Sequence, residues 1–118
     1  MISKDVLENL TFEVRMTVDK TPKTMNAREY AIALINEKKW LNDEWNKQNS
    51  IKLTFRDVDF EDVVFDVQAK LRDAEDKYYV KNGIEIRERV SNVKANREMR
   101  SKVAQDMVEN ARREILGE

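Results

Sequence analysis

The stretch FEDVVFDVQAKLRDAEDKY, residues 60–78, does most to decide the fold of this 118-residue chain. Its apolar residues recur at spacings of four and three, the heptad pattern of a helix that buries one stripe. We call the following set the heptad stripe: Phe60, Val64, Val67, Leu71, Ala74 and Tyr78. Asp59 can cap this helix, and Glu61 and Asp62 suit its positive N-terminal end. The pattern therefore predicts a helix that ends before Asn82.

The dipeptide Asn82-Gly83 is the strongest break that follows this helix. It is typical of a left-handed helix C-cap, and equally of a type I′ hairpin turn between residues 78–80 and 84–86. In either case apolar and charged residues alternate over 84–90, which predicts a strand. From Ser91 or Asn92 to Leu116 the pattern becomes helical, and Gly117 can end that helix.

Two further strands and one helix are predicted upstream. Apolar and polar residues alternate over 12–18 and again over 51–56, which indicates half-buried strands. Between them, Asn26 and Glu29 have the spacing of a capping box, so a helix is expected from there to about Gln48. One stripe of this helix consists of Ala27, Tyr30, Ala31, Leu34, Leu41 and Trp45, and Trp40 lies off it.

The predicted order is strand, helix, strand, helix, strand, helix. Every predicted strand has a polar face, unlike the continuously apolar strands of a covered parallel sheet. This favours an α+β fold, a small two-layer domain with about three amphipathic strands and three helices on one face. The alternative is an all-α helical bundle in which the short strands are misread. The length fits a single domain over residues 1–118.

The composition removes most catalytic chemistry. The chain has no His, no Cys and only two Gly, so common nucleophile–base pairs, classical zinc sites and Gly-rich phosphate loops are excluded. Carboxylates gather at 57–66, but Phe60 interrupts them and helix capping explains them. We therefore predict no enzyme, no cofactor and no metal site. Without a signal-peptide pattern or a spanning apolar stretch, we expect a cytoplasmic protein that does not bind membranes.

Apolar residues outside the main helix stripes indicate a protein-binding surface. Trp40 and Phe65 lie off their stripes, and Ile32 and Ile35 form a second apolar patch on the first long helix. The leading prediction is a non-enzymatic regulator, inhibitor or assembly factor that binds another protein through these residues. Self-association is a further possibility, through the heptad-stripe residues Phe60, Val64, Val67, Leu71 and Tyr78.

The alternative prediction is nucleic-acid binding. Basic residues concentrate in the stretch 87–102, where they outnumber the acidic ones, although the whole chain carries a net charge of -1. Such a stretch can contact phosphates. Its basic residues are Arg87, Arg89, Lys94, Arg97, Arg100 and Lys102. Because no aromatic residue lies on the polar face of a predicted strand, where bases would stack, this prediction ranks second.

Overall fold

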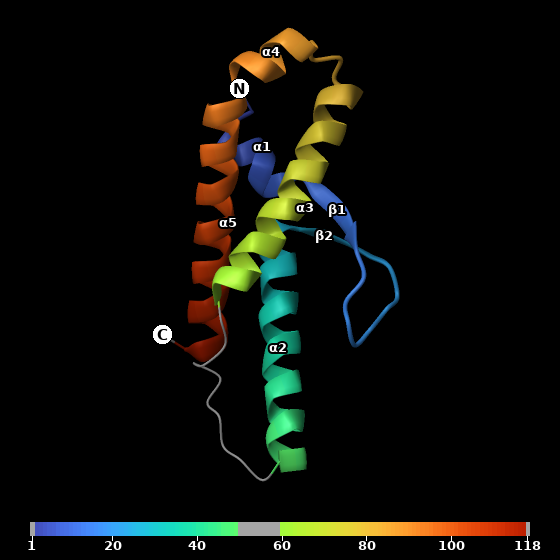
Figure 1. The fold of residues 1–118 in the computed structure, drawn as a ribbon, viewed down its shortest axis with the longest axis vertical. Helices are drawn as coiled ribbons and strands as arrows, with labels where there is room; N and C mark the ends of the chain where they lie inside the picture. Colours follow the sequence, from blue (N-terminus) through green and yellow to red (C-terminus); the bar gives the residue numbers. More distant parts are fainter. Residues whose placement is uncertain (1, 50–59, 118) are drawn as a thin grey trace.

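The computed structural model describes residues 2–49 and 60–117, and this part of the chain is mostly helical. Figure 1 shows the long helices packed together, with a small hairpin on one side and a short helix across one end. In chain order the elements are α1 (Lys4–Asn9), β1 (Thr11–Val14), β2 (Lys23–Asn26), α2 (Ala27–Asn49), α3 (Phe60–Lys81), α4 (Ile86–Ser91) and α5 (Val93–Leu116).

The sheet within the described residues is a two-stranded antiparallel hairpin of β1 and β2. Thr11 pairs with Asn26 and Val14 pairs with Lys23. The strand predicted over 12–18 is therefore right in kind but too long, because the chain leaves the ladder after Val14. The strand predicted over 51–56 lies outside the described residues. The expected arrangement of about three strands with three helices on one face is not the one that the described residues adopt.

The capping box at the start of α2 is confirmed. The backbone N–H of Glu29 donates to Asn26 Oδ1 at 2.9 Å, and the N–H of Asn26 donates to Glu29 Oε1 at 3.1 Å. Each side chain thus satisfies a backbone donor that the first turn of a helix leaves unpaired. The predicted helix follows and ends one residue beyond the expected Gln48.

Gly83 ends α3 as a left-handed cap, with a φ of 65°. Its N–H donates to the Val80 carbonyl at 3.3 Å, and the Ile84 N–H donates to the Tyr79 carbonyl at 3.1 Å. This pair of bonds is a Schellman motif, so the C-cap interpretation is confirmed. The hairpin interpretation and the strand predicted over 84–90 are wrong. Residues 78–80 form the last turn of α3 and cannot serve as a partner strand, and the chain continues as α4.

The helix predicted from Asn92 to Leu116 is confirmed as α5, and Gly117 caps it in the left-handed conformation. α2, α3 and α5 bury a common core, which α1 and the hairpin cover. The fully buried side chains include Leu7, Ile35, Val63, Val67, Leu71 and Val103. The core is therefore a three-helix core to which the hairpin contributes Val14.

α2 extends past the ends of α3 and α5, which gives the molecule its length of 56 Å against a width of 29 Å (Figure 1). Leu41 and Trp45 lie on this extension and are 41% and 44% exposed. They share a stripe with buried Ala31 and Leu34, so the sequence predicted them as core. The stripe continues along the helix, but the described helices that would cover it do not reach that far.

Candidate binding groove

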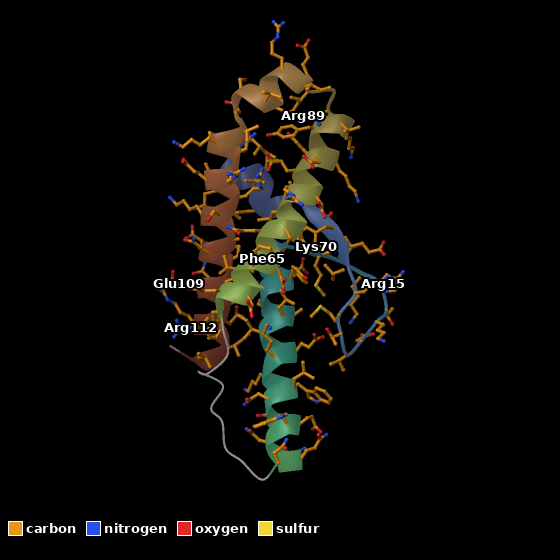
Figure 2. The ribbon with its side chains drawn as sticks, viewed as in Figure 1. Arg15, Phe65, Lys70, Arg89, Glu109 and Arg112 are labelled. Atoms are coloured by element: carbon orange, nitrogen blue, oxygen red, sulfur yellow. The ribbon has the colours of Figure 1, made fainter. Side chains whose placement is uncertain are left out.

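A groove runs between α3 and α5. Helical side chains form both of its walls. They are Phe60, Glu61, Val64, Phe65, Gln68, Ala69 and Arg72 on α3, and Arg97, Glu98, Arg100, Ser101, Lys102, Gln105, Val108, Glu109 and Arg112 on α5. Three adjoining hollows of about 510, 460 and 240 Å³ share Gln68. Figure 2 shows Phe65 on α3 opposite Glu109 and Arg112 of α5.

One end of the groove has most of its apolar side chains, with Glu61, Glu109 and Arg112 among them. Phe65 is 69% exposed and lines the largest hollow together with Phe60, Val64 and Val108. The Arg112 guanidinium lies 5.0 Å from the centre of the Phe60 ring, a cation–π distance. The Phe65 ring thus offers a large apolar surface to solvent beside other apolar side chains.

The other end of the groove is basic. The 240 Å³ hollow is lined by Phe65 and by three arginines, Arg72 of α3 and Arg97 and Arg100 of α5, and none of its described lining residues is a carboxylate. Arg100 donates to Glu75 Oε2 at 2.6 Å, which leaves it partly buried and paired. Arg72 and Arg97 are exposed, and neither forms an ion pair with a described residue. Their planar guanidinium groups can therefore receive a carboxylate or phosphate.

A buried polar network joins α3 to α5 beneath this basic end. Glu75 is 1% exposed and accepts a 2.9 Å hydrogen bond from the Tyr79 hydroxyl as well as the bond from Arg100. Asn96, 3% exposed, donates from Nδ2 to the Tyr79 oxygen at 2.7 Å. The Arg89 guanidinium of α4 lies 5.1 Å from the centre of the Tyr79 ring. This network holds the two walls of the groove in a fixed register.

The same burial perturbs two tyrosines. Burial raises the pKa of Tyr79, and the hydrogen-bonded Glu75 carboxylate raises it further. Burial also raises the pKa of Tyr30, helped by the charges of Asp66 and Glu37. Both phenols therefore keep their protons in the folded chain at pH values where free tyrosine, with a pKa of about 10, loses its own.

We expect the stability of the fold to decline as the pH rises above about 10. A folded-state pKa that is raised stabilises the protein below the unfolded value, and this stabilisation is lost as the pH rises towards the folded value. The check is denaturant unfolding at several alkaline pH values, with tyrosinate absorbance as the titration signal. Tyr79→Phe should reduce the change of the free energy of unfolding with pH. A variant whose free energy of unfolding changes with pH as steeply as that of the wild type would contradict the role given to Tyr79.

The groove brings together residues that the sequence assigned to two different functions. Phe65, predicted for protein binding, lies beside Arg97 and Arg100, predicted for nucleic-acid binding, and Lys102 lines the adjoining hollow. The basic stretch is not one face, however. Arg89 packs on Tyr79.

Arg87 and Lys94, the remaining basic residues of that stretch, line none of the three groove hollows. Sequence reasoning missed Arg72, although it follows Phe65 by seven residues and therefore shares its side of α3.

The other predicted binding residues lie on α2, away from this groove. Trp40 is 50% exposed and lines a separate hollow of about 290 Å³ with Met16 and Met25. Ile35 is fully buried and Ile32 is packed against the core, so neither Ile35 nor Ile32 forms the exposed apolar patch expected from the sequence. These two side chains belong to or pack against the hydrophobic core that α2 shares with α3 and α5.

The heptad-stripe residues likewise pack into or against the core of the chain itself. Val67 and Leu71 are fully buried, and Phe60, Val64 and Tyr78 are partly buried against the core. Val67 and Leu71 therefore present no surface to a second copy of the folded chain. Phe60 and Val64 contribute to the apolar end of the groove instead.

The loop between the two strands is tied to α2 and to itself. The Val18 N–H donates to Glu37 Oε2 at 3.2 Å, and Lys23 Nζ lies 2.9 Å from Asp19 Oδ2. The hydrogen bond from Lys23 lowers the pKa of the Asp19 carboxyl to about 2, with help from the Thr21 backbone. Asp19 is therefore ionised throughout the neutral range. It forms a surface ion pair and does not act as a proton donor.

Within residues 2–49 and 60–117, no three acidic side chains come close enough to hold a metal ion. Asp57 and Asp59 of the carboxylate cluster lie outside the described residues. No described helix has the length and apolar character needed to cross a bilayer. Comparison with protein-family models, with curated proteins and with solved structures finds no match to this chain.

Proposed function

We propose that this chain is a non-enzymatic protein-binding module, a small regulator, inhibitor or assembly factor that binds its partner protein through the α3–α5 groove. The observation that carries the proposal is the position of Phe65, which is 69% exposed in a groove whose next hollow is lined by three arginines. Aromatic and Arg side chains dominate the binding energy of protein interfaces, and they do so when they lie together in a pocket.

The groove is also built on ordered elements of the fold. Its walls belong to two long helices, and the buried Glu75–Arg100 ion pair with Tyr79 and Asn96 fixes one wall against the other. A surface that is already ordered loses less conformational entropy when a partner binds. The arrangement supports recognition better than chemistry, because a chain without His and Cys lacks the usual groups that activate a nucleophile.

Replacing Phe65 by Ser is expected to weaken partner binding by at least about tenfold, or about 1.4 kcal/mol. The tagged chain is purified from its own cells at low and at high salt, and the co-purifying protein is quantified. Val80→Ser is the matched control, since Val80 is 71% exposed on the same helix and lines none of the groove hollows.

Both variants should unfold near the wild-type temperature, because both side chains are exposed. A partner that stays bound to Phe65→Ser, or that Val80→Ser releases equally, would count against the groove as the binding surface. Retention of the partner at high salt would agree with the apolar contact of Phe65.

Nucleic-acid binding remains the second candidate, and the structure gives it one specific support. An exposed aromatic ring now lies beside Arg97 and Arg100, which is the combination that single-stranded nucleic acid requires. The same purification distinguishes the two functions. Nucleic acid that co-purifies at low salt and is released at high salt would favour this candidate, because phosphate contacts weaken steeply with salt.

A further inference from the structure

We infer that the α3–α5 groove binds an amphipathic α-helix of a partner protein, and that this helix carries carboxylates at one end of its apolar face. The inference rests on the proposed protein-binding function and adds the chemistry of the partner. It follows from the length of the groove, from the kind of side chains that line it, and from the unequal distribution of charge between its two ends.

The groove has the dimensions of a helix site. Its α5 wall runs from Arg97 to Arg112, which corresponds to about 22 Å at the helical rise of 1.5 Å per residue. Both walls are helices, so their side chains form ridges along which a further helix can pack. A partner helix of about four turns would fill the three hollows and add a fourth helix to α2, α3 and α5.

The lining favours a helix over an extended segment. The walls present helix side chains, and every described residue that lines the three hollows belongs to α3 or α5. The uncharged polar groups on them are Gln68, Ser101 and Gln105. An extended peptide would bury backbone N–H and C=O groups with few partners here, whereas a helix satisfies its own backbone internally.

Charge then orients the partner. Arg72 and Arg97 form no ion pair with a described residue, and they lie at the end of the groove next to α4. The opposite end holds Phe60, Val64 and Val108 together with Glu61, Glu109 and Arg112, and Phe65 lies between the two ends. A helix with apolar residues along one face and Asp or Glu at one end of that face would match both ends at once, each carboxylate meeting a guanidinium in the bidentate geometry.

The test is selection from a displayed library of helix-forming peptides of about 16 residues with randomised apolar and charged positions. The bait is the full chain. Enriched sequences should carry apolar residues at helical spacing and carboxylates at one end. A synthetic peptide of the winning sequence, measured by fluorescence anisotropy, should bind Arg72→Glu/Arg97→Glu at least about tenfold more weakly than wild type, and Phe65→Ser likewise.

A matched charge control is Lys77→Glu/Arg87→Glu, which reverses two exposed cations that do not line the groove and should leave peptide binding unchanged. A peptide in which Lys replaces the terminal carboxylates should recover binding to Arg72→Glu/Arg97→Glu and lose binding to wild type. This charge exchange identifies the contact directly, because a variant that simply failed to fold would bind neither peptide.

Several results would overturn the inference. These are a library with no enrichment, winners without carboxylates, or peptide binding that ignores Arg72 and Arg97. Displacement of the peptide by a single-stranded oligonucleotide would assign the groove to nucleic acid. A dimer without peptide that Phe65→Ser dissociates would assign it to a second copy of this chain. If Phe65→Ser releases the cellular partner while the winners are not acidic helices, the proposed function stands and this inference fails.

Discussion

Replacing Glu75 by Gln is expected to lower the free energy of unfolding by about 3 kcal/mol. Both oxygens of Glu75 accept hydrogen bonds, one from the Tyr79 hydroxyl and one from Arg100, and the side chain is 1% exposed. The neutral amide has one accepting atom where the carboxylate has two, and the partly buried Arg100 would lose its counter-charge. Urea denaturation measures this loss of free energy directly, and the midpoint temperature of thermal unfolding should fall by about 10 °C.

Glu109→Gln is the control for that experiment. Glu109 pairs with Arg113 at 2.6 Å, but both side chains are more than half exposed, so this change should cost no more than about 0.5 kcal/mol. The double variant Glu75→Leu/Arg100→Leu should recover part of the loss, since it leaves no buried charge without its partner. Equal effects of Glu75→Gln and Glu109→Gln would show that the buried pair does not stabilise the fold.

Replacing Leu71 by Ala is expected to cost about 3 kcal/mol, whereas Phe65→Ala should change the free energy of unfolding by no more than about 0.5 kcal/mol. Leu71 is fully buried at the centre of the heptad stripe, and its removal leaves a cavity among α2, α3 and α5. Phe65, six residues earlier on the same helix, is 69% exposed.

Denaturant unfolding of the two variants in parallel tests this division of α3 into a core side and a binding side. If Phe65→Ala destabilises the chain as much as Leu71→Ala, Phe65 is a core residue and the groove loses its apolar contact. If Leu71→Ala costs nothing measurable, the heptad stripe does not face the core. The expected contrast follows from burial alone, because the two side chains are similar in apolar character.

Signals that act over a few residues were readable in the sequence. Asn26 and Glu29 satisfy each other's backbone within one turn, and Gly83 and Gly117 adopt the positive φ that ends a helix. The spacing of the heptad stripe likewise predicted α3, and Val67, Leu71 and Ala74 of the stripe are buried. Val63 and Tyr79 are buried too, although they lie outside the stripe. These features are local, so the sequence determines them without reference to the rest of the chain.

The sequence misjudged the elements whose form depends on a distant partner. Alternation over 84–90 predicted a strand, but a strand needs a neighbour, and the segment that would have paired with it is the last turn of α3. The short helix α4 forms there instead. Conversely, β2 carries no clear alternation and exists because β1 pairs with it. Ladder hydrogen bonds join residues far apart in the chain, so periodicity alone cannot place them.

The sequence by itself determined where the three long helices lie, how α2 begins and how α3 and α5 end, and that the chain contains no His and no Cys. Only the tertiary structure decided which apolar residues remain exposed and which charges meet. Ile35 and Phe65 both looked available for binding, yet the crossing of α2, α3 and α5 buries the first and exposes the second. The same packing places Phe65 beside Arg97 and buries Glu75 against Arg100, because side-chain burial depends on which elements pack together and not on spacing along one helix.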